Sequence, residues 1–113
     1  MCTHKMKLER EPFEKIIRGQ KIIESRLYDE KRRQINIGDH IEFISIRNPS
    51  KKILTKVKAL YRYDSFKDLF SDLPSDYFGS ISKTELIREI KTFYSEDEER
   101  KYGVIGIKIE LLK

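Results

Sequence analysis

The sequence is poor in the residue types that build disulfide frameworks and zinc sites. It has one cysteine, Cys2, so no intramolecular disulfide can form, and this fits a reducing, cytoplasmic setting. The two histidines, His4 and His40, add too few further ligands for a structural zinc site. We therefore expect no bound metal, and no motif in the sequence requires an organic cofactor.

Long hydrophobic runs are also missing. No apolar stretch approaches the roughly 18–20 residues that a membrane-spanning helix needs, and no signal peptide is recognisable. The sequence thus predicts a small cytoplasmic protein without a membrane partner. A length of 113 residues favours one domain with one core of modest size, which we expect to span residues 1–113.

Charge, by contrast, is abundant. Charged residues make up 38% of the chain, and 24 lysines and arginines against 19 aspartates and glutamates give a formal net charge of +5. This excess favours polyanionic partners such as nucleic acid, although many ordinary proteins carry as much.

Apolar periodicity and turn residues predict elements in the order β-α-β-β-β-α-α-α-β. We expect strands over residues 4–8, 22–27, 53–63 and 105–111, with a further strand around Ile41 and Phe43. The last strand should turn Gly106 outward, and Phe93 should lie on the packed side of a helix. Few parallel crossovers follow from this order. The pattern therefore indicates an α+β fold with a mainly antiparallel sheet or small barrel wrapped by helices.

The most informative segment is Gly19–Arg26, which reads G-x-K-x-x-E-x-R. Strand alternation places Glu24 and Arg26 on one face and the apolar residues beside them on the other. Lys21 stands where the strand begins. An ammonium, a carboxylate and a guanidinium in this arrangement can bind a phosphate, a carboxylate or the hydrogen-bonding edge of a base.

This run resembles the signature of ASCH domains, which are relatives of the PUA RNA-binding fold. The resemblance extends over nearly the whole chain, since a helix precedes the motif, Gly38-Asp39 precedes a strand and Tyr102-Gly103 leads into an apolar terminal strand. It implies a small, mainly antiparallel PUA-like β-barrel with helices packed around its mouth. It also implies a cleft, lined by Lys21, Glu24 and Arg26, that binds RNA or a nucleotide-like ligand.

One bacterial branch of this family hydrolyses the acetyl amide of N-acetylated cytidine. A lysine that matches Lys21 and an acidic residue on a late helix are regarded as catalytic there, and Thr84-Glu85-Leu86 resembles that helix. The resemblance thus implies, as an alternative, a metal-independent amidohydrolase acting on a modified nucleoside, with Lys21 and Glu85 as catalytic residues. This chain departs from the branch at Glu24, where the branch has a threonine. Water would then have to attack directly, and Glu24 is a candidate to assist it.

Each of these residues also has a purely structural explanation. Lys21, Glu24 and Arg26 can form ion pairs that orient the strand. Glu85 stands three residues after Ser82, where a capping-box glutamate belongs. A protein-interaction module with a vestigial cleft remains a third hypothesis.

The strand predicted over residues 53–63 offers a second candidate surface. Its odd positions form a core-like face, which includes Tyr61 and Tyr63. The even positions form a basic face that carries Lys52, Lys56, Lys58 and Arg62. This face, with Lys31-Arg32-Arg33 nearby in sequence, can follow a phosphate backbone. Charged outer faces of antiparallel strands are, however, usually only solvated.

Overall fold

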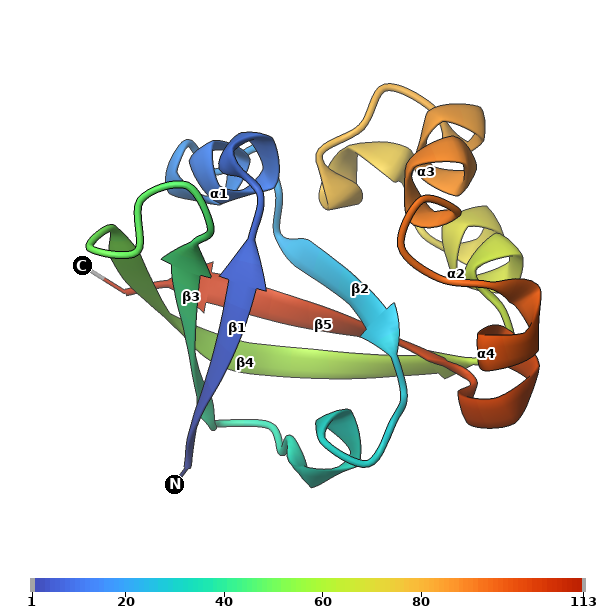
Figure 1. Ribbon diagram of the computed structural model, residues 1–113, viewed down its shortest axis with the longest axis horizontal. Coiled ribbons are helices and arrows are strands. Elements are labelled where there is room, and N and C mark those ends of the chain that lie inside the picture. The colour runs from blue at the N-terminus through green and yellow to red at the C-terminus, as the bar shows by residue number, and fades with distance from the viewer. Residues whose placement is uncertain (1, 113) are drawn as a thin grey trace.

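The computed structural model describes residues 2–112, and at its centre lies a curled, five-stranded sheet (Figure 1). The strands are β1 (Thr3–Leu8), β2 (Ile23–Leu27), β3 (His40–Ser45), β4 (Lys52–Tyr63) and β5 (Val104–Leu111), in the spatial order β1-β3-β4-β5-β2. β1 pairs with β3 in parallel, and the other neighbouring strands are antiparallel. Because β1 and β2 are the two edges, the curled sheet forms a half-barrel with a seam between them.

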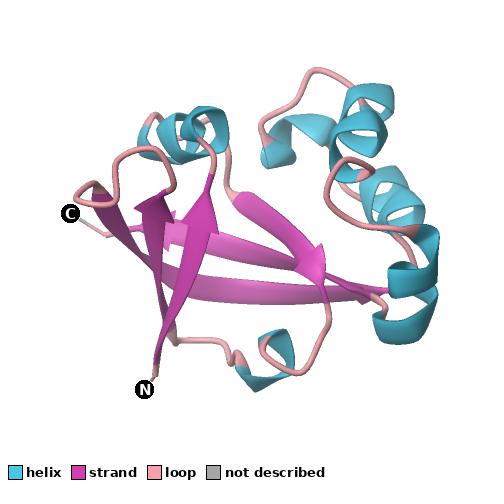
Figure 2. Cartoon of the chain, in the orientation of Figure 1, coloured by secondary structure: helices cyan, strands magenta, loops and turns pink. Residues whose placement is uncertain are grey.

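Four α-helices and two short 3-10 helices complete the fold (Figure 2). They are α1 (Arg10–Ile17), η1 (Arg32–Gln34), α2 (Phe66–Asp72), η2 (Ser75–Phe78), α3 (Lys83–Ile90) and α4 (Glu96–Tyr102). The predicted order of strands and α-helices and the α+β class are confirmed. Among residues 2–112, no helix is both long and apolar enough to cross a membrane.

The sheet separates two clusters of buried side chains. The inner face of the half-barrel packs against α1, and its core includes Phe13, Phe43 and Ile107. The outer face, near β2 and the start of β5, packs against α2 and α3 through a second core that includes Ile23 and Leu69. In a sheet covered on both faces, few side chains are exposed to water. This is why β5 is apolar except at Lys108 and Glu110.

Gly106 in β5 shows the effect of this second layer. The sequence pattern predicts that it faces outward, but the residue is buried beneath α2. A Cβ atom at this position would lie 3.0 Å from Leu69 Cδ1 and 3.3 Å from Ile23 Cγ2. The predicted facing of Gly106 is therefore confirmed, but alternation along one strand does not reveal the helix that covers this outer face. Glu110, beyond the helices, is exposed as expected.

β4 does not keep one core face along its length. The register with β5 shifts between Val57 and Ala59, and such a bulge reverses the alternation of side chains. Thr55 and Val57 are fully buried and point to the inner face, whereas Tyr61 and Tyr63 pack on the helix side. The two tyrosines pack against buried side chains as predicted, but in the second core, on the outer face of the sheet.

The N-terminal strand is held in place by Asp39, which precedes β3. Its carboxylate lies 2.8 Å from His4 Nε2 and accepts hydrogen bonds from the backbone amides of Asn36 at 3.0 Å and Cys2 at 3.4 Å. The hydrogen bond with His4, followed by that from Asn36, lowers the pKa of Asp39 to about 2. This carboxylate therefore ties β1 to the turn that starts β3.

Candidate functional site

The signature residues line a cavity of about 550 Å³. Its walls come from the end of β1 and α1, from the start of β2, from the turn at Phe78-Gly79 and from the segment 86–94. In Figure 1 these parts lie at one end of the half-barrel, with α1 on one side and α3 on the other. The volume falls within the range of roughly 300–1,000 Å³ that is typical of small-molecule sites.

The chain enters this site through a glycine-capped turn. α1 ends at Ile17 and is capped by Arg18, and Gly19 follows with a φ of 75°, a left-handed conformation that suits a residue without a side chain. The amides of Gln20 and Lys21 donate to the carbonyl of Lys15, and the amide of Ile22 donates to the carbonyl of Tyr77. These bonds place Lys21 between α1 and the η2 turn, just before β2 begins.

Lys21, Glu24 and Arg26 form one ionic triad. Lys21 Nζ lies 3.1 Å from Glu24 Oε1, and Arg26 Nε donates to Glu24 Oε2 at 2.7 Å. The side chains of Lys21, Glu24 and Arg26 are only 8%, 7% and 14% exposed. The predicted alternation is confirmed, because Glu24 and Arg26 pair with Ile107 and Ile105 on the inner face.

Electrostatics keep this buried carboxylate ionised. Burial alone would raise the pKa of Glu24, but the charges and hydrogen bonds of Lys21 and Arg26 hold that pKa below its usual value. Burial would similarly lower the pKa of Arg26, but the carboxylate of Glu24 raises it above its usual value. The triad thus places two cations and one anion in the cavity, where water screens them little.

Arg26 also closes the seam of the half-barrel. Its Nη2 donates to the carbonyl of Lys7 on β1 at 2.9 Å, and Lys31 Nζ donates to the carbonyl of Lys5 at 3.2 Å. The two edge strands are therefore joined by side chains rather than by a backbone ladder. Arg26 serves the fold and the cavity together.

An aromatic wall faces the triad. The apolar and aromatic residues that line the cavity include Phe70, Phe78, Leu86, Ile90, Phe93 and Tyr94. α3 ends at Ile90, so Phe93 is not on a packed helical face as predicted but is 62% exposed. Tyr94 stacks on the buried Phe66 with ring centroids 5.5 Å apart. This wall offers a flat surface on which a ring can stack.

Phe93 and Tyr94 are not predicted as site residues from the sequence, although one signal is present. Ser95 caps α4 with an extended backbone, and the reciprocal bonds of its capping box with Glu98 are both formed. A cap at that position requires the residues just before it to lie in a connection between helices. Phe93 and Tyr94 therefore lie in the connection between α3 and α4 and not on the packed face of α3.

Comparison with known proteins identifies the family. The family model for the ASCH domain matches residues 6–113. This chain belongs to the ASCH domain family. The crystal structure of the hypothetical protein PH0355 is 40% identical, with a TM-score of 0.87 over 97% of this chain and 99% of that one. The solution structure of PF0455 from Pyrococcus furiosus is also 40% identical, with a TM-score of 0.77 over 98% of each chain.

More distant ASCH structures share the fold. The ASCH protein of Zymomonas mobilis is 18% identical, with a TM-score of 0.57 over 96% of this chain and 66% of that one. The ASCH domain from Lactobacillus crispatus is 10% identical, with a TM-score of 0.63 over 97% of this chain and 79% of that one. These matches confirm the half-barrel with its helices as an ASCH fold. No curated protein matches the chain.

In this ASCH domain, Glu85 does not line the cavity. Ser82 Oγ accepts a hydrogen bond from the amide of Glu85 at 3.1 Å, but the Glu85 side chain pairs with Arg88 instead of reaching back to the cap. Only half of the predicted capping box is therefore present. The hydrogen bond from Arg88 lowers the pKa of Glu85. Glu89, one turn later on α3, is the α3 carboxylate that does line the cavity.

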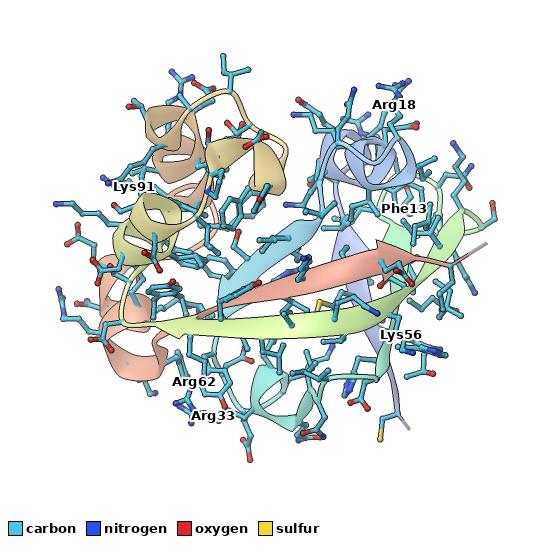
Figure 3. All side chains as sticks on the ribbon, turned by 180° about the vertical axis from the view of Figure 1, so that it is seen from behind. Phe13, Arg18, Arg33, Lys56, Arg62 and Lys91 are labelled. Carbon is cyan, nitrogen blue, oxygen red and sulfur yellow. The ribbon has the colours of Figure 1, made fainter. Side chains whose placement is uncertain are left out.

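The four basic residues predicted to form one face of β4 are divided by the bulge. Lys52 and Lys56 precede it on the outer face, and Lys58 lies at the register shift itself. Arg62 lies beyond the shift on the inner-face side, with its guanidinium 4.4 Å from the centroid of the Tyr28 ring. Figure 3 shows Lys56 and Arg62 well separated along the strand. None of the four lines the cavity of the triad.

Metal ligands are not gathered at any point of the described chain. Within residues 2–112, no cluster of three or more His, Cys, Asp or Glu side chains is placed to hold a metal ion.

Proposed function

We propose that the cavity binds a nucleobase, either of an RNA or of a free modified nucleoside. The observation that carries this proposal is the buried triad of Lys21, Glu24 and Arg26 facing an aromatic wall across one cavity. A nucleobase has a flat apolar face and a polar edge, and proteins recognise unpaired bases by stacking on the face and hydrogen bonding to the edge. The two sides of the cavity match these two surfaces.

The triad retains hydrogen-bonding capacity for such an edge. A carboxylate has about four acceptor positions, and Glu24 uses one on each oxygen for Lys21 and Arg26. Arg26 has five N–H donors, of which Nε and one on Nη2 are used. The cavity therefore offers both acceptors and donors, as the mixed edge of a base requires.

The charge of the cavity favours a neutral ligand. The charged residues in the lining are Lys7, Lys15, Lys21 and Arg26 against Glu9, Glu11, Glu24 and Glu89. These charges balance, so the cavity has no excess of cations for a polyphosphate. A base or nucleoside fits this balance better than a nucleoside triphosphate does.

Binding of nucleosides and short RNAs, measured by calorimetry, tests the proposal. Loss of stacking on one aromatic residue costs about 1–3 kcal/mol, so Phe93→Ala should weaken binding by roughly 5- to 150-fold. The matched control is Ile81→Ala, because Ile81 is 94% exposed and lies outside the cavity lining. Equal effects of the two substitutions, or no binding by the unmodified protein, would contradict the proposal.

A second candidate function is hydrolysis of the acetyl amide of N-acetylated cytidine. The distance of 3.1 Å between Lys21 Nζ and the buried Glu24 carboxylate favours it, since such a pair can exchange a proton with attacking water. In this reaction Lys21 and Glu24 would take a proton from the attacking water, and Arg26 would stabilise the developing oxyanion. The same proton would pass to the amine of cytidine as the acetyl C–N bond breaks, which releases acetate. We assign Glu85 no step in this proposal, because its side chain pairs with Arg88 and does not line the cavity. Loss of the acetyl group is followed by chromatography, and turnover that survives Lys21→Ala would refute this assignment.

A further inference from the structure

A second cationic site lies beyond the far end of β2. Tyr28 follows this strand, and the Cζ atoms of Arg33 and Arg62 each lie 4.4 Å from the centroid of its ring. Arg33 belongs to η1 and Arg62 to the end of β4, and Figure 3 shows the two side by side. Both distances are well within the range of cation–π contact. One aromatic ring thus holds two guanidinium groups together.

Neither guanidinium has an anionic partner. In the described part of the chain, Arg33 and Arg62 form no ion pair and no side-chain hydrogen bond, while Arg32, which precedes Arg33 in sequence, pairs with Asp29 at 2.9 Å. Arg62 also borders a depression lined by Asp64, Asp68 and Asp72, yet it pairs with none of them. With five N–H donors each, the two arginines offer a bidentate edge that is not used within the chain.

The two unpaired guanidinium groups, rather than the net charge around them, favour an anionic ligand. Segment 29–33 carries the cations Lys31, Arg32 and Arg33 against Asp29 and Glu30, while Arg62 borders the depression with three aspartates. Two guanidiniums on one ring repel each other, and each lies at most about 8.8 Å from the other, twice the distance to the centroid. An anion that accepts hydrogen bonds from both groups relieves this repulsion. Contact with the Tyr28 ring holds both guanidinium groups near it, so less conformational freedom is lost when they bind an anion.

We propose that Tyr28, Arg33 and Arg62 form a site for the phosphate backbone of single-stranded RNA. Guanidinium groups bind phosphate through paired hydrogen bonds, and Arg33 and Arg62 both have donors that are not used within residues 2–112. The choice of RNA among polyanions rests on the proposed function of the cavity. Tyr28 continues the alternation of Glu24 and Arg26, about 7 Å along the strand direction from Arg26. A single-stranded RNA with one base in the cavity can therefore also reach this site with its backbone.

The salt dependence of RNA binding tests the site. Fluorescence anisotropy with a labelled oligouridylate is measured between 50 and 200 mM salt, a range in which each phosphate contact on a single strand adds about 0.7 to the slope of log K against log salt. Arg33→Gln with Arg62→Gln should lower this slope by about 1.4 and weaken binding. The matched control, Arg18→Gln with Arg47→Gln, removes the same charge from two exposed arginines elsewhere. Equal effects of the two double variants would overturn the proposal.

The ring gives a second, independent comparison. Tyr28→Phe keeps the aromatic surface and should keep the wild-type slope, whereas Tyr28→Leu should lower it as the arginine variants do. Identical slopes for Tyr28→Phe and Tyr28→Leu would contradict a role for the ring. Circular dichroism spectra of all variants establish that they are folded.

The test of this arginine site can fail or succeed independently of the test of nucleobase binding in the cavity. Free nucleosides lack a backbone, so Arg33→Gln with Arg62→Gln should bind them as the wild type does. A slope that falls as expected in a protein that binds no nucleoside would refute the proposed function and support this site. A slope that stays unchanged in a protein that binds nucleosides would overturn this site alone. Tighter binding of an acidic peptide than of RNA would also overturn it.

Discussion

Removing the charge of Glu24 should lower the stability of the protein strongly, because this carboxylate is shared by the two cations of the ionic triad. Glu24→Gln keeps the shape of the side chain but leaves the Lys21 ammonium and the Arg26 guanidinium without their shared carboxylate. Breaking a buried ion pair in this way costs about 3–5 kcal/mol, because a desolvated charge remains unpaired. Arg26 is 14% exposed and keeps its bond to the Lys7 carbonyl, so we expect the lower end, about 3 kcal/mol.

Urea denaturation followed by circular dichroism measures this loss. The midpoint should fall while the slope with urea stays the same, which indicates a change in stability rather than in compactness. The matched control is Glu11→Gln, which breaks an ion pair with Lys15 of similar length, 3.0 Å, but with a carboxylate that is 78% exposed. Exposed pairs contribute about 0–1 kcal/mol. A loss of less than about 1 kcal/mol for Glu24→Gln would show that the triad behaves as a surface pair and would refute the reasoning.

A double-mutant cycle separates the pair from other effects. Lys21→Met removes one of the two cations that Glu24→Gln leaves without a partner. The double variant should therefore lose less free energy of unfolding than the two single variants together, by at least about 1 kcal/mol. The difference between wild type and Glu24→Gln should also shrink on acidification. Because the pKa of Glu24 is lowered in the fold, its contribution is complete above its unfolded pKa and is lost as the pH falls through the folded one. Additive losses, or a difference that grows at low pH, would contradict this account.

Two further substitutions test the fold around the site. Asp39→Asn should cost about 2 kcal/mol at pH 7, because the carboxylate has a pKa of about 2 in the fold against 3.8 as its ordinary value. The cost should be about half as large at pH 3, and an equal cost at both pH values in urea denaturation would contradict the assignment. Gly106→Ala should destabilise by about 1–3 kcal/mol through overpacking against Leu69. Leu69→Ala should offset part of that loss in the double variant, and additive thermal shifts would show that the two residues do not clash.

The elements of this fold were predictable because their signals are local. Glycine at position 19 ends α1, serine caps begin α2, α3 and α4, and period-two alternation marks β2 and β3. The facing of Glu24 and Arg26 follows from the same alternation. The element order and the α+β class therefore needed no knowledge of tertiary contacts.

What the sequence did not reveal depends on contacts between distant segments. The bulge after Val57 reverses the facing of the following residues, and no residue type at that point signals it. Burial of Gly106 requires α2 to cover β5, and the pairing of Glu85 with Arg88 competes with its cap. Likewise, Arg33 and Arg62 are 29 positions apart in sequence and meet only because Tyr28 lies between their elements.

The most direct test of the central claim is a nuclear magnetic resonance titration of the isotope-labelled protein with ribonucleosides and N-acetylated cytidine. Backbone amide shifts report where a ligand binds, and a chain of 13.6 kDa suits the method. We expect saturable shifts in the segments that contribute the cavity lining, which are residues 7–15, 21–26, 78–79 and 86–94. Saturable shifts that map elsewhere, or none at millimolar nucleoside, would contradict a nucleobase site in this cavity.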